Sequence, residues 1–278
     1  MSDTAKTRRY ARLERHGDQA AEGAQTRAVF AELVAGEARP LDGAPWLGGA
    51  PTGEVWGSFD EEGRGEAARR LAPVAPKTIL CVGRNYKAHA QELGNEVPKE
   101  PLLFLKPTSS LLGPDGAVEL PPRSISERVE HEAELGVIIG RRVRRASLEE
   151  AKAAIFGCTL VFDITARDLQ KKDGQWTRAK GMDTFCPVGP VVVTGLDVAS
   201  LALRCEVNGE VRQRGETSQM IFSVPEVIAY ASQVMTLEPG DLLVTGTPPG
   251  VGPLAAGDAL SLTIAEIGTL RLSIVGPP

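Results

Sequence analysis

Residues 129–139 constrain the fold more than any other segment, because alternating carboxylates run there into an unbroken apolar stretch. A strand turns successive side chains to opposite faces, so Glu130, Glu132 and Glu134 would share one face, about 6.5–7 Å apart. The apolar residues 135–139 indicate an interior strand. Carboxylates that enter a buried sheet need a partner, and a metal ion is an efficient one. Spacing alone leaves the alternative of a solvated strand face open.

Asp163 is a further ligand candidate, because it closes the apolar run of residues 158–162. Side chains at the end of a buried strand, where a loop begins, often belong to functional sites. The alternative is a helix or turn cap formed with Thr165 and Arg167. An all-oxygen ligand set favours Mg²⁺ or Mn²⁺ and leaves coordination positions open for substrate.

His89 and Glu92 lie three residues apart in a predicted helical stretch, residues 85–93, so they face the same way. An imidazole beside a carboxylate can act as a general base on water. A surface pair is the alternative. Lys106 and Lys180 could supply positive charge to an enolate or oxyanion, or they could be solvated side chains. The loop 246–252 could bind a carboxylate through its amides and the Thr247 hydroxyl, or it could be only a tight turn.

The rest of the chain predicts a mixed α+β, mainly β fold. The first 72 residues are broken by glycine and proline, which predicts a small, mostly β N-terminal domain before a catalytic domain at 73–278. Ser147 and Ser223 begin Ser-x-x-Glu capping boxes, which predict helix starts. The second of these helices has a predicted core-facing stripe. Its members are Val224, Val227, Ile228, Ala231 and Val234.

Composition excludes several classes of protein. The formal net charge of −5 has its signs interspersed, so no basic surface indicates nucleic acid or an anionic membrane as a partner. There is no apolar window of the roughly 18 residues that a membrane span requires, and the N-terminus shows no signal peptide. The four cysteines are scattered without a CxxC pair, so we expect a cytoplasmic protein without disulfides.

Six fragments, in order, resemble the fumarylacetoacetate hydrolase family. They are residues 82–86 with His89 and Glu92, then 104–107, 131–136, 163–168, 180–185 and 245–252. The resemblance implies a β-sandwich roll with peripheral helices, one Mg²⁺ or Mn²⁺ per subunit and a homodimer. The first 72 residues resemble the variable small domain of bacterial members.

The resemblance also implies roles for individual residues. Glu132, Glu134 and Asp163 match the metal ligands, which leaves Glu130 outside the site. His89 and Glu92 match a water-activating pair, and Lys180 matches a lysine beside the metal. Four further residues match contacts to a substrate carboxylate. They are Arg84, Lys106, Arg167 and Thr247.

The implied activity is that of an enzyme acting on 2-oxo or 2-hydroxydienoic acids, with the cation and Lys180 stabilising an enolate. Because His89 and Glu92 are present, hydrolysis of a C–C bond in an acylpyruvate or fumarylpyruvate-type substrate is favoured. The alternatives are a 2-hydroxyhepta-2,4-diene-1,7-dioate isomerase and an oxaloacetate decarboxylase. A dicarboxylate-sensing binding protein is the non-enzyme alternative.

Overall fold

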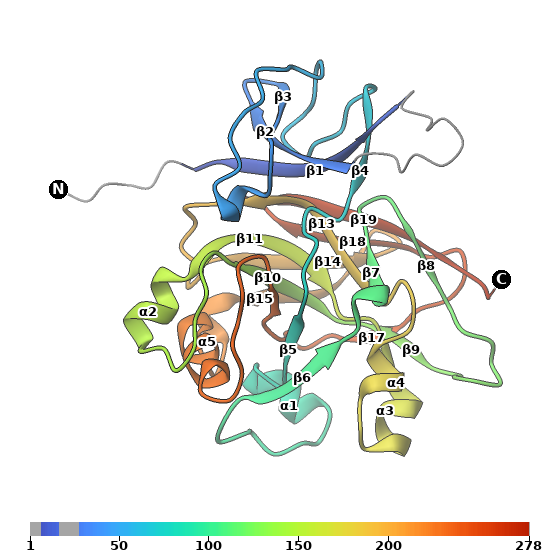
Figure 1. Cartoon of the computed structure of the whole chain (residues 1–278). Coiled ribbons are helices and arrows are strands. Elements are labelled where there is room, and N and C mark those ends of the chain that lie inside the picture. Colours follow the sequence, from blue (N-terminus) through green and yellow to red (C-terminus); the bar gives the residue numbers. More distant parts are fainter. Residues whose placement is uncertain (1–6, 17–27, 278) are drawn as a thin grey trace.

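The computed structural model describes residues 7–16 and 28–277, whose strands form three sheets (Figure 1). The large sheet has the order β3 (Glu37–Pro40), β2 (Ala28–Val34), β1 (Arg9–Arg15), β13 (Cys186–Val193), β11 (Ile155–Phe162), β10 (Ala133–Ile139), β16 (Leu242–Val244), β5 (Ile79–Gly83) and β6 (Leu102–Lys106). Two short strands join it from the side, β4 (Ala68–Leu71) on β1 and β7 (Leu111–Leu112) on β13.

Two smaller sheets complete the β structure. One has the order β12 (Thr165–Ala166), β9 (Val129–His131) and β17 (Gly252–Pro253). The other has the order β15 (Glu210–Glu216), β14 (Ala202–Val207), β18 (Ala259–Ile264), β19 (Gly268–Val275) and β8 (Ala117–Glu119). The 3₁₀ turns are η1 (Pro45–Leu47), η2 (Thr108–Ser110) and η3 (Thr217–Gln219).

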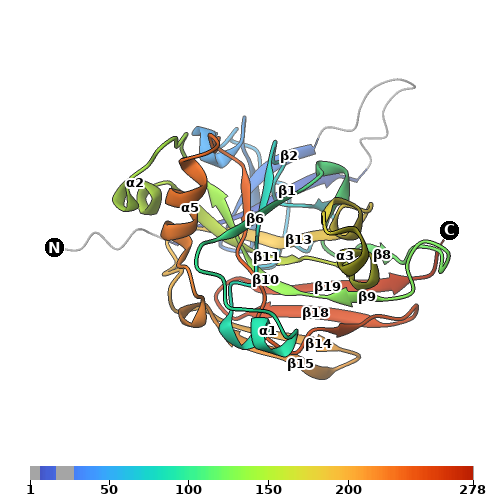
Figure 2. The ribbon, with the colours of Figure 1, turned by 90° about the horizontal axis from the view of Figure 1, so that it is seen from below.

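Short helices lie around the sheets. They are α1 (Lys87–Glu92), α2 (Leu148–Ala153), α3 (Arg167–Asp173), α4 (Thr177–Lys180) and α5 (Val224–Ser232). Seen from below, α2 and α5 lie together on one side and α3 on the other (Figure 2). The predicted mixed, mainly β fold with peripheral helices is therefore confirmed. None of the helices in the described part of the chain is long and apolar enough to cross a membrane.

Both faces of the central strands of the large sheet are covered by packed apolar side chains. Every residue of β10 and of β13 is buried, as expected for strands inside a sheet with two covered faces. Along β10, Val137 and Ile139 pack into one apolar cluster, while Ile138 packs into another. The interior strand predicted for residues 135–139 is confirmed.

Both capping boxes form as predicted, at Ser147 before α2 and at Ser223 before α5. The stripe along α5 is buried except for its last member. The prediction that Val234 belongs to this stripe is wrong, because the helix ends at Ser232 and Val234 is 74 % exposed. The predicted helical stretch at 85–93 is shorter in the structure, Lys87–Glu92.

Strands from the first 72 residues continue the large sheet, because β1 pairs with β13 through Arg9 and Tyr10. The boundary predicted at residue 72 stays a prediction. Trp46 belongs to the same apolar cluster as Ile138, and its ring lies 6.0 Å from that of Phe156.

We expect the Trp46→Ala variant to lose about 3–5 kcal/mol of unfolding free energy, the range for truncating a buried aromatic side chain. Urea unfolding followed by far-ultraviolet circular dichroism measures this loss. Leu47→Ala is the matched control, because the Leu47 side chain is 70 % exposed. A Trp46→Ala variant as stable as the control would show that this contact does not support the core.

Candidate metal centre

Three buried carboxylates meet where β10 begins and β11 ends. Glu134 lies in β10, Glu132 immediately precedes it, and Asp163 immediately follows β11. The antiparallel register places Ala133 opposite Phe162, and the Asp163 amide donates to the Glu132 carbonyl at 2.9 Å. One ligand oxygen from each carboxylate lies within 4.8 Å of the others. The register of two strands thus assembles the three predicted ligands.

Glu130 separates from these carboxylates because the strand is interrupted. The sequence predicts one strand at residues 129–139, whereas the structure has β9 and β10 with Glu132 between them. Glu130 lies in β9 and accepts hydrogen bonds from Arg167 Nε and Arg128 Nε, both at 2.6 Å. Two arginines therefore pair with this buried carboxylate, and one of them, Arg167, also donates to Glu132.

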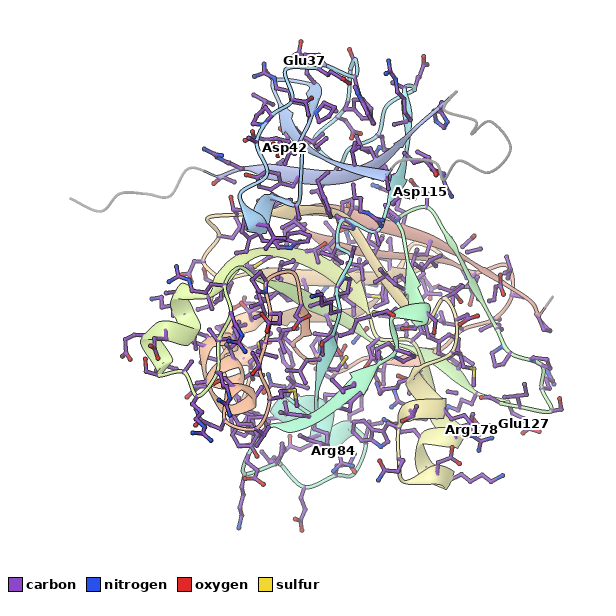
Figure 3. The ribbon with its side chains drawn as sticks, viewed as in Figure 1. Glu37, Asp42, Arg84, Asp115, Glu127 and Arg178 are labelled. Atoms are coloured by element: carbon purple, nitrogen blue, oxygen red, sulfur yellow. The ribbon has the colours of Figure 1, made fainter. Side chains whose placement is uncertain are left out.

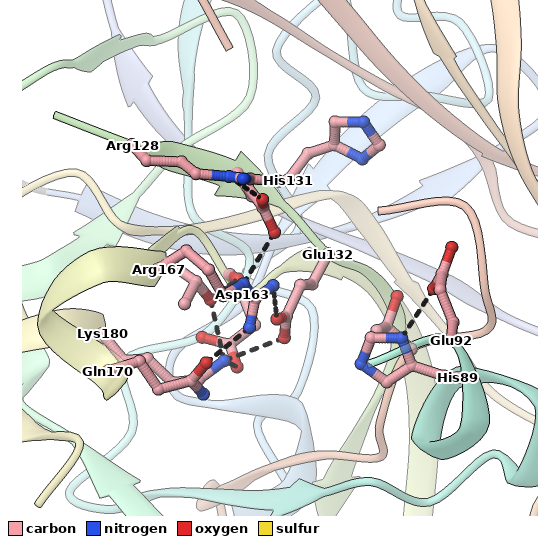
Figure 4. Close-up of polar contacts among 12 residues, drawn as sticks. His89, Glu92, Arg128, His131, Glu132, Asp163, Arg167, Gln170 and Lys180 are labelled. Carbon is pink, nitrogen blue, oxygen red and sulfur yellow. Dashed lines mark hydrogen bonds and ion pairs between the residues drawn. The ribbon is translucent and has the colours of Figure 1, made fainter. Parts of the chain in front are cut away.

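Basic side chains surround two of the three clustered carboxylates (Figure 4). Lys180 Nζ, at the end of α4, donates to Glu132 Oε2 at 2.8 Å and also to Asp163. Lys106 Nζ donates to Asp163 Oδ1 at 2.6 Å. Arg167 Nη2 donates to Glu132 Oε1 at 2.5 Å. Both carboxylates are therefore paired with cations of the chain itself.

The titration behaviour follows from these contacts. Burial alone would raise the pKa of Glu132, but attraction by Lys180 and Arg167 lowers it well below its usual value. Burial likewise opposes the charge on Lys180, yet Asp163 and Glu132 raise the pKa of Lys180. Glu134 differs, because burial and then repulsion by Asp163 and Glu132 raise the pKa of Glu134 well above its usual value.

The surroundings of Glu134 test whether this site fits a metal ion. Glu134 accepts a hydrogen bond from the Gly246 amide, but no ion pair among the described residues includes it. A divalent cation beside Glu132, Glu134 and Asp163 would supply the missing positive charge. Three carboxylates suit a hard cation such as Mg²⁺ or Mn²⁺ and leave positions for other oxygen ligands. The residues present therefore fit such an ion.

His89 and Glu92 form a hydrogen-bonded pair on α1, with Nδ1 of His89 3.2 Å from Glu92 Oε2. The other oxygen of Glu92 accepts from the Gly250 amide at 2.9 Å. A carboxylate only accepts, so in a neutral ring this contact places the proton on Nδ1 and leaves Nε2 free to take one. The pair is therefore arranged as a general base with its orienting acid.

One cavity of about 490 Å³ joins the pair to the three carboxylates. It is lined by all but one of the residues proposed from the resemblance, namely Arg84, His89, Glu92, Glu132, Glu134, Asp163, Arg167, Lys180 and Thr247. The exception, Lys106, is 3 % exposed and contacts Asp163 from outside the cavity lining. The Lys106 side chain is thus placed to support Asp163, and its predicted contact with a substrate carboxylate stays a prediction.

Two cavity residues have features that the sequence did not indicate. The Thr247 hydroxyl donates to the Ala133 carbonyl at 2.8 Å, so its proton is already engaged. Arg84, near α1 at the lower edge of the molecule (Figure 3), has a φ of 58°. A residue other than glycine is strained in this left-handed backbone conformation, and such strain often marks functional sites.

The cavity wall also includes residues that the sequence did not point to, among them Phe104, Gln170 and Trp176. Gln170 accepts from Arg167 Nη1 at 2.6 Å, and its position three residues after Arg167 in α3 was the available signal. The rings of Phe104 and Trp176 lie 5.1 Å apart, edge to face. This aromatic contact joins β6 to the loop before α4, and nothing in the local sequence indicates it.

Comparison with known proteins identifies the family. Residues 78–275 match the family model of the fumarylacetoacetate (FAA) hydrolase C-terminal domain, and that range holds all ten proposed site residues. The chain belongs to the fumarylacetoacetate hydrolase family.

Family members similar to this chain are named for different activities. The mitochondrial oxaloacetate decarboxylase of Dictyostelium discoideum is 46 % identical over 69 % of this chain and 91 % of its own. The 2-hydroxyhepta-2,4-diene-1,7-dioate isomerase of Mycobacterium marinum has a solved structure, 40 % identical with a TM-score of 0.83, covering 97 % of this chain and 98 % of that one. The fumarylacetoacetate hydrolase of Exiguobacterium antarcticum is 31 % identical with a TM-score of 0.78, covering 97 % and 99 %. Membership therefore establishes the kind of enzyme and leaves the reaction to the site.

Proposed function

We propose that the protein is a divalent-metal-dependent hydrolase that cleaves a C–C bond in acylpyruvate-type 2-oxo acids. The observation that carries the proposal is the His89–Glu92 pair, which lines the same cavity as Glu132, Glu134 and Asp163. Hydrolysis needs an activated water beside the group that polarises the substrate. The cavity provides a base for the first and a ligand set for the second.

Each side chain has a task in this reaction. A bound Mg²⁺ or Mn²⁺ supplies Lewis acidity toward the 2-oxo acid end of the substrate. Lys180, which is buried and charged, adds a fixed positive charge where negative charge develops on the substrate oxygen. Arg167 keeps Glu132 oriented and charged through its ion pair. The polar end of the cavity thereby fixes the orientation of the substrate.

His89 performs the proton transfer. Its Nε2 takes a proton from water while Glu92 holds Nδ1, and the resulting hydroxide attacks the distal acyl carbonyl. The bond between that carbon and the methylene then breaks, and its electron pair passes into the enolate of the departing pyruvate unit. The proton held by His89 passes to the methylene carbon, which becomes the methyl group of pyruvate. The products are a carboxylic acid and pyruvate, so water is the only co-substrate.

The test is turnover of a panel of 2-oxo acids with Mg²⁺ or Mn²⁺, with the products identified by mass spectrometry. Equal amounts of pyruvate and carboxylic acid from an acylpyruvate are expected. Conversion of a 2-hydroxydienoate to its isomer without water uptake would instead indicate an isomerase. Binding of these acids without turnover of any would contradict the proposal and favour a dicarboxylate sensor.

Oxaloacetate decarboxylation is the second candidate, supported by the 46 % identity to the Dictyostelium enzyme. Decarboxylation needs an electron sink at the 2-oxo group and no attacking water, so Lys180 and the metal ligands would serve it without His89. Release of CO₂ from oxaloacetate distinguishes this reaction.

A homodimer is also part of the proposal. Light scattering of the purified protein measures its molecular mass and so tests the oligomeric state.

Trp176 should limit the size of the substrate's acyl group, because its ring forms part of the cavity wall. We expect Trp176→Ala to raise the ratio of kcat/KM for benzoylpyruvate over acetylpyruvate by about tenfold, the lower range for a change in pocket size. Steady-state kinetics on both substrates measures the ratio. Gln175→Ala, an exposed neighbour, is the control. An unchanged ratio in the Trp176 variant would place the acyl group elsewhere in the cavity.

A further inference from the structure

Gln213 is a buried polar residue in an otherwise exposed strand. It lies in β15, at the edge of the five-stranded sheet, where most side chains point to solvent. The Gln213 side chain is fully buried, with 0 % exposure. Burying an amide costs free energy unless its hydrogen bonds are made inside the protein. The contacts of this side chain therefore indicate what its burial accomplishes.

The direction of every hydrogen bond around Gln213 is determined by chemistry. Oε1 accepts from the Ala133 amide at 3.0 Å, and an amide N–H can only donate. Nε2 donates to the Pro248 carbonyl at 2.8 Å, and a carbonyl can only accept. Nε2 also donates to the Thr247 hydroxyl at 2.8 Å, and this hydroxyl donates in turn to the Ala133 carbonyl. The two polar groups of Ala133 are thus joined to Thr247 in a closed ring through Gln213.

One side of the ring holds the metal-ligand segment. Glu132 lies in the interruption between β9 and β10, and Gln213 Oε1 contacts both of its neighbours, the Ala133 amide and His131 Nδ1 at 3.0 Å. Because Oε1 is an acceptor, His131 carries its proton on Nδ1. Gln213 therefore binds the backbone of Ala133 on one side of Glu132 and the side chain of His131 on the other.

The other side of the ring holds the loop 246–250. The Gly246 amide donates to Glu134, and the Gly250 amide donates to Glu92. A Cβ atom on Gly250 would lie 2.0 Å from the Arg212 carbonyl oxygen, so this loop packs backbone against backbone on β15. Gln213 holds the middle of the loop through Thr247 and Pro248. The loop thus connects Gln213 to the proposed metal ligand Glu134 and to Glu92 of the His89–Glu92 pair.

We propose that Gln213 is a positioning residue that holds Glu132 and the loop 246–250 in the geometry required for metal binding and for the His89–Glu92 pair. This inference rests on the proposed metal-dependent function. Residues that support metal ligands contribute about 10–100-fold to metal affinity or activity. Gln213 supports Glu132 and Glu134 from a separate sheet, without itself lining the cavity.

The test compares Mn²⁺ affinity, measured by isothermal titration calorimetry on metal-free protein, with thermal stability. Gln213→Met has a similar volume but makes no hydrogen bonds, and we expect Mn²⁺ to bind it about 10–100-fold more weakly. Val207→Ala is the matched control, because Val207 is buried in the neighbouring strand β14 and makes none of these contacts. The control should lose thermal stability while keeping the parent's Mn²⁺ affinity.

A second pair of variants covers the case in which Gln213→Met does not fold. Thr247→Val removes the hydroxyl of the ring and should weaken Mn²⁺ binding, whereas Thr247→Ser keeps the hydroxyl and should restore it. If either Gln213→Met or Thr247→Val bound Mn²⁺ as the parent does, the positioning role would be refuted while the metal site stood. A parent protein that neither bound Mn²⁺ nor turned over any 2-oxo acid would overturn the proposed function and this inference together.

Discussion

Replacing His89 by alanine will lower kcat for acylpyruvate hydrolysis by about 10²–10⁴-fold, the usual contribution of a positioned general base. The ring is buried beside the three carboxylates and its Nδ1 is held by Glu92, so Nε2 is the group that can accept the proton of water. Metal binding should not change, because His89 is not among the clustered ligands. Steady-state kinetics with saturating Mn²⁺, together with calorimetric Mn²⁺ titration, measures both quantities.

His16→Ala is the control for this experiment, because His16 is exposed in the described N-terminal strand region and does not line the cavity. Oxaloacetate serves as a second control, since decarboxylation needs no attacking water. The His89 variant should therefore keep any decarboxylase activity that the parent has. Hydrolysis at the parent rate by the His89 variant would show that the water is activated by another group.

Replacing Glu134 by glutamine should abolish Mn²⁺-dependent stabilisation without lowering the stability of the metal-free protein. The substitution keeps the volume of the side chain and removes a carboxyl group whose ionisation is opposed by burial and by repulsion from Asp163 and Glu132. At Mn²⁺ concentrations about 100 times the parent's Kd, the parent gains about 2.7 kcal/mol, and the variant should gain almost none. Thermal unfolding with and without Mn²⁺ measures the difference.

Glu130→Gln is the matched control, because it makes the same chemical change four residues away and should give the opposite result. It removes the carboxylate that pairs with Arg167, which is 3 % exposed. Breaking a buried ion pair costs about 3–5 kcal/mol, so this variant should unfold at a lower temperature. It should nevertheless still be stabilised by Mn²⁺. Equal Mn²⁺ responses in the two variants would remove the basis for choosing Glu134 as a ligand.

Local sequence was informative wherever a pattern stays within one element. The capping boxes at Ser147 and Ser223 start helices as predicted, because each joins groups only three residues apart. The spacing of His89 and Glu92 likewise placed both on one helix face. The stripe on α5 failed only at Val234, beyond the end of the helix. Residues 135–139 were recognised as a buried strand from their apolar character alone.

Contacts between elements could not be derived in this way. Three glutamates at alternate positions look equivalent, yet Glu130 pairs with arginines while Glu132 and Glu134 join Asp163. Beside the interruption of the strand at Glu132, the Ala133 amide donates to Gln213, which comes from a strand 80 residues later in the chain. The sequence proposes Lys106 as a substrate contact, and only the structure shows that its Nζ donates to Asp163 from outside the cavity lining.

The amino-acid sequence by itself determined which residues were available for the chemistry: a buried strand with carboxylates, an acid ending the next strand, and a histidine one helical turn from a glutamate. Only the tertiary structure decided which carboxylates share a site, which cations neutralise them and which loop braces them. The physical reason is that periodicity is a property of a single element. The register between strands is set by hydrogen bonds and packing among residues distant in the chain.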